Sequence, residues 1–129
     1  MGASSRARRS LSALALALSI AALGAQEQGP TARPIRIIAS RYKFDPPRIE
    51  VTQDDLVQID LRTSDIAHSW TVDAYRIAKR ATPGHPVTFE FRADKAGTFP
   101  YYCNLQLEDG CRQMRGELVV KPRTNRGAR

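Results

Sequence analysis

Two thiols, a thioether and one imidazole are the side chains through which this sequence could bind a metal ion. Cys103, Cys111 and Met114 lie close together late in the chain, and His68 lies well before them. Sulfur donors combined with an imidazole favour copper or zinc over magnesium or calcium. Zinc accepts cysteine and histidine but seldom methionine, so Met114 favours copper. These four residues are the predicted metal ligands.

The two cysteines have a second possible chemistry, because they could form a disulfide across the loop that separates them. Paired cysteines in an exported protein are commonly oxidised. Met114 could also be an ordinary core residue, since methionine fills apolar interiors. The sequence leaves both alternatives open, although the placement of His68 and Met114 favours thiols that are available to a metal.

The N-terminus has the organisation of a secretory signal peptide. Arg8 and Arg9 precede an apolar run from Leu11 to Leu23, and the small residues up to Ala25 provide a cleavage site. The run is too short to span a bilayer comfortably. We therefore expect residues 1–25 to be removed, which predicts a periplasmic or secreted protein with no membrane span after removal of the signal.

The positive charge of the chain is concentrated at its two ends. Of the 20 lysines and arginines, three lie in the predicted signal peptide and four follow residue 120, which leaves 13 against the 13 acidic residues. Binding of nucleic acid needs a concentrated basic surface on the fold itself. The charge distribution therefore argues against a nucleic-acid partner.

Alternation of apolar and polar residues predicts an all-β domain, because the two-residue period is that of half-buried strands. Short strands with frequent turn signals favour an antiparallel β-sandwich. We expect a disordered leader over residues 26–34, one domain over 35–121 and a basic tail over 122–129. The longest irregular connection runs from residue 73 to residue 85 and includes a possible helical turn. The seven predicted strands are 35–39, 48–52, 56–63, 68–72, 87–92, 98–103 and 117–121.

The order of the strands suggests how the ligands meet. A hairpin of residues 87–93 and 98–103 would pair residues whose numbers sum to about 191, which places His85 near the loop from Cys103 to Met114. His85 is therefore a possible further ligand. A helical turn would bring Cys111 and Met114 to one side. His68 shares a strand face with Trp70, so its imidazole should be buried and need a partner.

The chain contains the segments Asp65-Ile-Ala-His68-Ser-Trp70, Ala81-Thr-Pro-Gly84, Ala96-Gly-Thr-Phe-Pro-Tyr-Tyr-Cys103 and Met114-x-Gly116-x-Leu118-x-Val120. These four segments resemble the cupredoxins, most closely the copper-binding domain of cytochrome c oxidase subunit II and small secreted single-domain relatives. The resemblance implies a Greek-key β-sandwich with copper at one end. It also implies that Cys111 stands where the family places a second histidine, so a single copper ion is expected rather than a binuclear centre.

The function expected from these observations is one-electron transfer by an exported, mononuclear copper protein. Its partner would be a redox protein or a copper-trafficking protein. Two thiolates favour the cuprous ion, so a Cu(I) carrier or storage protein is one alternative. A metal-free interaction domain stabilised by a disulfide is another. No nucleophile-base pair, paired carboxylates or phosphate loop predicts an enzyme.

Overall fold

The computed structural model describes residues 2, 24, 32–106 and 108–124. Almost all of the predicted signal peptide and most of the predicted leader lie outside these residues, as does the end of the basic tail. Those assignments therefore stay predictions. No helix among the described residues is long and apolar enough to cross a membrane.

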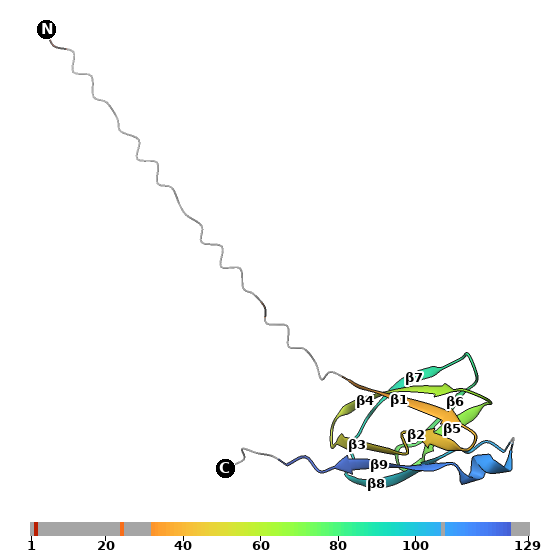
Figure 1. Ribbon diagram of the computed structural model, residues 1–129. Coiled ribbons are helices and arrows are strands. Elements are labelled where there is room, and N and C mark those ends of the chain that lie inside the picture. The colour runs from red at the N-terminus through yellow and green to blue at the C-terminus, as the bar shows by residue number, and fades with distance from the viewer. Residues whose placement is uncertain (1, 3–23, 25–31, 107, 125–129) are drawn as a thin grey trace.

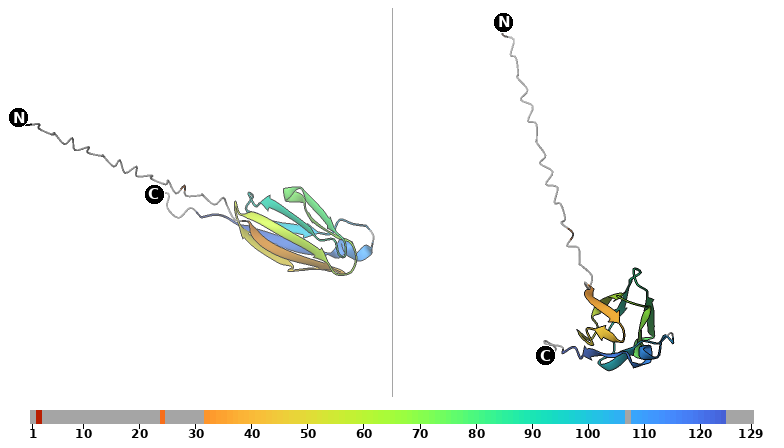
Figure 2. Two further views of the ribbon diagram at one scale, coloured as in Figure 1. Left: turned by 90° about the horizontal axis from the view of Figure 1, so that it is seen from above. Right: turned by 45° about the vertical axis from the view of Figure 1, so that its right-hand side comes forward.

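Two β-sheets pack face to face, which confirms the predicted all-β sandwich (Figures 1 and 2). Two short 3-10 helices, η1 (Asp73–Tyr75) and η2 (Asp109–Gln113), complete the described elements. The first sheet has the order β2 (Lys43–Asp45), β1 (Arg33–Ser40), β4 (Leu56–Thr63) and β7 (Val87–Arg92). The second has the order β3 (Arg48–Thr52), β9 (Arg115–Lys121), β8 (Gly97–Tyr102), β5 (His68–Val72) and β6 (Ile77–Ala81).

Strand direction is mixed, which the alternation pattern could not reveal. β1 pairs with β4 in parallel, and β3 pairs with β9 in parallel. The remaining strand pairs are antiparallel, as expected. The parallel pairs arise because the chain changes sheets between β1 and β4, so strands distant in sequence become neighbours. A two-residue period records which face of a strand is buried, and it carries no information on direction.

The core lies between the two sheets and is centred on Trp70. Alternate residues of β4, such as Ile59 and Leu61, are fully buried in this core. The Trp70 ring centroid lies 5.8 Å from that of Phe89 in the opposite sheet and 5.4 Å from that of Tyr101 on β8. All five residues of β5 are buried, so the strand that begins at His68 is fixed on both faces.

The predicted hairpin between residues 87–93 and 98–103 is wrong. β7 pairs with β4, whereas β8 pairs with β9 and β5 in the other sheet. After β7, the Ala93 N–H donates to the Asp55 carbonyl at 2.9 Å, and the Asp54 N–H donates to the Ala93 carbonyl at 2.8 Å. These bonds hold Ala93, which is buried, against the turn before β4, so the chain crosses to the second sheet.

The register argument that placed His85 near the Cys103–Met114 loop fails with the hairpin. His85 is exposed, and its backbone closes a tight turn with Thr82. The segment from 73 to 85, predicted as irregular, contains η1 and β6. β6 was missed because three of its five residues are exposed in succession, which hides the strand period.

Candidate metal site

Strand pairing brings three of the predicted ligands to one end of the second sheet. His68 begins β5, Cys103 directly follows β8, and Met114 directly precedes β9. β8 is antiparallel to both of its neighbours, and Tyr102 at its end pairs with Arg115 at the start of β9 and with Thr71 of β5. The chain that leaves β8 at Cys103 therefore runs alongside β5 toward His68. The Cys103 N–H donates to the Met114 carbonyl at 3.4 Å, which extends the ladder beyond the strands.

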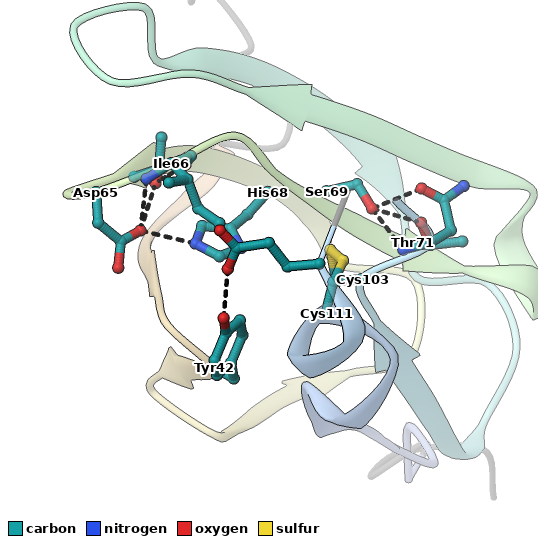
Figure 3. The surroundings of a disulfide bond; sticks show 11 residues. Tyr42, Asp65, Ile66, His68, Ser69, Thr71, Cys103 and Cys111 are labelled. Atoms are coloured by element: carbon teal, nitrogen blue, oxygen red, sulfur yellow. Dashed lines mark hydrogen bonds and ion pairs between the residues drawn. A yellow bond between two sulfur atoms is a disulfide. The ribbon is translucent and has the colours of Figure 1, made fainter. Parts of the chain in front are cut away.

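The fourth predicted ligand, Cys111, is brought to the same end by η2. The Met114 N–H donates to the Cys111 carbonyl at 3.2 Å, which is the helical turn expected from their spacing. All four predicted ligands are buried, with exposed fractions of 0% for His68 and Met114 and 2% for each cysteine. Figure 3 shows His68 and the two cysteines on neighbouring elements.

Cys103 and Cys111 form a disulfide, with their Cα atoms 5.3 Å apart. The chain contains two cysteines, so neither thiol is free in this form. The preference for free thiols is therefore wrong for this form, because η2 brings the two cysteines close enough to bond; the disulfide is the alternative that the sequence left open. Among the described residues, no group of three or more His, Cys, Asp or Glu side chains could hold a metal ion.

The His68 ring has one satisfied nitrogen and one unsatisfied nitrogen. Nε2 lies 2.8 Å from Oδ1 of Asp65, and Nε2 must be the donor because a carboxylate only accepts. Nδ1 is buried and has no hydrogen-bond partner in the described part of the chain. A buried polar atom without a partner is costly, and coordination of a metal ion is one way to satisfy an imidazole lone pair.

Asp65 is held as a carboxylate by several hydrogen bonds. Burial raises its pKa, but donation from the backbone N–H groups of Arg41 and Ile66 and from His68 outweighs burial and lowers the pKa to about 2. The Arg41 N–H lies 2.6 Å from Oδ2, and the Ile66 N–H lies 2.7 Å from Oδ1. The negative charge keeps the proton on Nε2 of His68, so the Nδ1 lone pair remains available.

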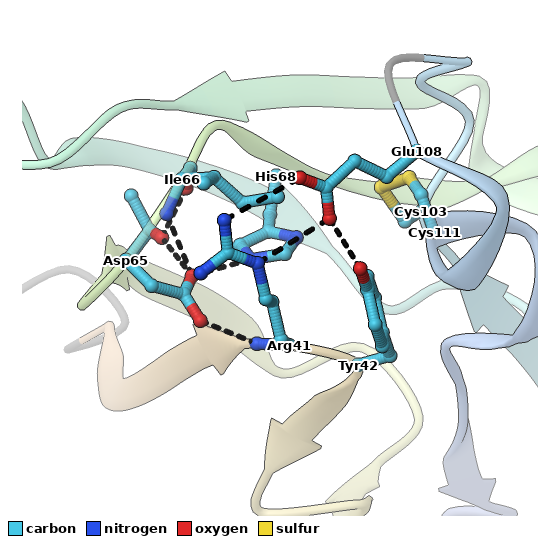
Figure 4. A network of polar contacts seen from close by, with 9 residues as sticks. Arg41, Tyr42, Asp65, Ile66, His68, Cys103, Glu108 and Cys111 are labelled. Atoms are coloured by element: carbon cyan, nitrogen blue, oxygen red, sulfur yellow. Dashed lines mark hydrogen bonds and ion pairs between the residues drawn. A yellow bond between two sulfur atoms is a disulfide. The ribbon is translucent and has the colours of Figure 1, made fainter.

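A second carboxylate ties the disulfide loop to the rest of the fold (Figure 4). Glu108 accepts hydrogen bonds from the Tyr42 hydroxyl and from the Arg41 guanidinium, whose Nε lies 3.3 Å away. The Tyr42 hydrogen bond and then the Arg41 contacts lower the pKa of Glu108. A side chain at Gly110 would overlap the Tyr42 ring. The β1–β2 turn therefore holds η2, and with it Cys111, in place.

The sequence did not reveal this supporting network. Asp65 stood in a segment quoted for its resemblance, and its spacing from His68 was the available signal. Arg41, Tyr42 and Glu108 carry no motif, because they come from segments distant in the sequence that meet only in the folded chain.

The fold and the arrangement of these side chains agree with a family match. The sequence model of the family described as "Cupredoxin-like domain" matches residues 11–120. The chain belongs to this family. The family match therefore confirms the resemblance that was inferred from the segments around His68 and Cys103.

Curated relatives of this cupredoxin-like chain are oxidase subunits. Cytochrome c oxidase subunit 2 of Thermus thermophilus is 25% identical over 95 residues, which cover 74% of this chain and 70% of the relative. A second subunit 2 sequence from a strain of the same species is also 25% identical, and the match covers 56% of its length. The match therefore spans between 56% and 70% of the length of these two relatives.

Solved structures share the cupredoxin fold at lower identity. The periplasmic domain of cytochrome oxidase subunit II of Bradyrhizobium japonicum has a TM-score of 0.64 at 16% identity, covering 72% of this chain and 87% of that one. A mixed disulfide between a thioredoxin-like protein and subunit II of cytochrome c oxidase gives 0.60 at 17%, covering 76% and 88%. Auracyanin A of Chloroflexus aurantiacus, a blue copper protein, gives 0.55 at 19%, covering 69% and 100%.

The fit of the four predicted ligands to copper depends on the state of the cysteines. In the disulfide form only the His68 imidazole and the Met114 thioether remain as good donors, which is too few for a firm site. Reduction would add two thiolates at the same end of the second sheet as His68. One imidazole, two thiolates and a thioether are a soft set that suits copper, so the reduced chain fits the ion and the oxidised chain does not.

Proposed function

We propose that this protein is an exported copper-binding cupredoxin that carries single electrons, and that it binds copper only after the Cys103–Cys111 disulfide is reduced. The observation that carries the proposal is the buried Nδ1 atom of His68, which has no partner among the described residues while Nε2 is held by Asp65. A merely structural histidine at this depth would be expected to use both nitrogens.

His68, Cys103, Cys111 and Met114 would hold one copper ion, which when bound supplies a one-electron couple. Asp65 keeps the proton on Nε2 and so orients the imidazole. Buried strand ends hold the ligands nearly fixed, which limits rearrangement between the two oxidation states. The proposed function is therefore electron transfer, and no catalytic role is assigned to the chain itself.

The partner follows from the disulfide. A protein that must be reduced before it binds metal needs a thiol reductant, and the mixed disulfide of a subunit II with a thioredoxin-like protein supports such a partner. A redox protein or a copper-trafficking protein would act afterwards. The predicted signal peptide and the disulfide support a periplasmic or secreted location, because disulfides persist in oxidising compartments.

The disulfide favours a metal-free interaction domain as a second candidate function. The disulfide seals both thiols in the oxidised form, which suits a metal-free domain stabilised by its crosslink. A Cu(I) carrier shares the ligand set of the leading proposal and differs from it in redox behaviour.

The test is an anaerobic titration of reduced, desalted protein with Cu(I) in the presence of a competing chelator, with oxidised protein as the control. We expect one copper ion per reduced chain and much weaker binding by Cys103→Ser and by oxidised protein. Voltammetry of the copper form should then show a reversible couple. Tight Cu(I) binding without that couple would favour the carrier, and no copper uptake by the reduced chain would favour the metal-free domain.

A further inference from the structure

A pocket of about 270 Å³ opens beside one of the two cysteines of the disulfide. Its lining includes Cys103 but not Cys111. Both cysteines are almost completely buried, so a reductant needs an opening to reach the sulfur atoms. Of the two cysteines, Cys103 is the one that borders this pocket.

The pocket is cationic. Arg112 and Arg115 line it, and none of its lining residues is acidic. Both arginines are exposed, and within the described residues the Arg112 side chain has neither an ion pair nor a hydrogen bond. Arg115 lies over the Tyr102 ring, with its guanidinium carbon 5.9 Å from the ring centroid. Figure 4 shows Glu108 near the disulfide, but its carboxylate is bound by Arg41 and Tyr42.

We propose that the Arg112–Arg115 pocket binds an anionic group of the thiol reductant and directs its thiolate to Cys103. Two positive charges in a lining that contains no acidic residue attract an anionic reductant and raise its local concentration. Asn104 and Gln106 add hydrogen-bonding groups to the same lining. The occupant is therefore a thiol or dithiol with an acidic group close to its reactive sulfur.

The reaction is a two-electron thiol–disulfide exchange. The incoming thiolate attacks Sγ of Cys103, the Cys103–Cys111 bond breaks, and its electron pair leaves on Sγ of Cys111 as a thiolate. A second thiolate of the reductant then attacks the reductant's own sulfur in the mixed disulfide. This step releases the Cys103 thiolate and leaves the reductant oxidised. The inference rests on the proposed function, because reduction prepares the chain for copper.

Copper-free protein tests the pocket directly. The disulfide is reduced at low ionic strength with anionic 2-mercaptoethanesulfonate or neutral 2-mercaptoethanol, each at the same thiolate concentration. We expect Arg112→Gln/Arg115→Gln to slow the sulfonate reaction roughly threefold or more, with little change for the neutral thiol. The matched control is Arg76→Gln/Arg80→Gln, which removes the same charge from residues outside the pocket.

The proposal would be overturned if Arg112→Gln/Arg115→Gln slowed the reactions of both thiols equally, or if the control variant slowed the sulfonate reaction as much. Failure of both thiols to reduce the folded protein would also overturn it. Added salt should remove the difference between the thiols.

A second measurement identifies the sulfur that is attacked. The reaction is quenched with an alkylating reagent at partial completion, and cleavage after Glu108 separates the two cysteines for mass analysis. We expect the mixed disulfide on Cys103 and the alkyl group on Cys111. The reverse pattern refutes the directed attack. Since neither measurement involves copper, a failure here is distinct from a failure of copper binding.

Discussion

His68 owes its available nitrogen to a carboxylate three residues earlier. Asp65 accepts from Nε2 and is itself held by two backbone N–H groups. Partners of this kind fix the tautomer and orientation of a metal-binding histidine, and their loss commonly reduces metal affinity by about 10- to 100-fold. Asp65 is therefore a positioning residue for the proposed copper site.

Asp65→Asn should weaken Cu(I) binding by the reduced protein roughly tenfold or more. The neutral amide no longer anchors the Nε2 proton by charge, so the Nδ1 lone pair is less well presented. Competitive chelator titration measures the change. Asp60→Asn is the matched control, because Asp60 binds Arg36 and Arg62 on the surface. Unchanged affinity in Asp65→Asn would remove its positioning role.

Residue types were enough to select His68, Cys103, Cys111 and Met114 as candidates, and the structure brings all four to one end. They were not enough to distinguish a dithiol from a disulfide, because both chemistries use the same pair of cysteines. The contacts of Glu108 with Arg41 and Tyr42 could not be predicted, since no sequence period links these segments.

β8 and β9 are the elements that fix the spacing of Cys103 and Met114. Their register pairs Tyr101 with Gly116 directly beside the site. The Tyr101 ring is fully buried and its hydroxyl donates to the Pro46 carbonyl at 2.9 Å. A Cβ atom at Gly116 would overlap this ring, so glycine is required by the close approach of the two strands.

Gly116→Ala should lower the free energy of unfolding by about 1–3 kcal/mol, because the Tyr101 ring must move in a closely packed core. Urea or thermal unfolding measures the loss. Thr98→Ala provides the control, since Thr98 is exposed on the same strand pair. If the two variants were equally stable, the close packing inferred at Gly116 would be wrong.

Strands with clear alternation, such as β4 and β7, were predicted close to their observed bounds. β6 was missed because its exposed run has no alternation, and β2 because three residues are too few to show a period. The false hairpin arose from assuming that consecutive strands pair, whereas the bonds of Ala93 direct the chain to the other sheet.

At the scale of the whole molecule, the disulfide closes a loop with a sequence separation of 8 at one end of the sandwich. Crosslinking a loop of this length restricts the unfolded chain and is worth about 2–3 kcal/mol in the entropic description. The same bond that removes the thiols from metal chemistry therefore stabilises the fold while no metal is present.

Reduction without copper should lower the melting temperature by roughly 10–20 °C, as measured by circular dichroism or calorimetry. Cu(I) added to the reduced protein should raise the melting temperature again, because a ligand that binds only the folded state stabilises it. Cys103→Ala/Cys111→Ala should show no response to the reductant. A melting temperature that is the same with and without the disulfide would contradict this account.

The single tryptophan of the chain gives these changes an optical reporter. Trp70 is fully buried, lies two positions after His68 on β5, and contacts rings from both sheets. Its indole emission responds to the polarity around it and to quenching groups nearby. Unlabelled protein can therefore report core packing and events at the metal end through one fluorescence signal.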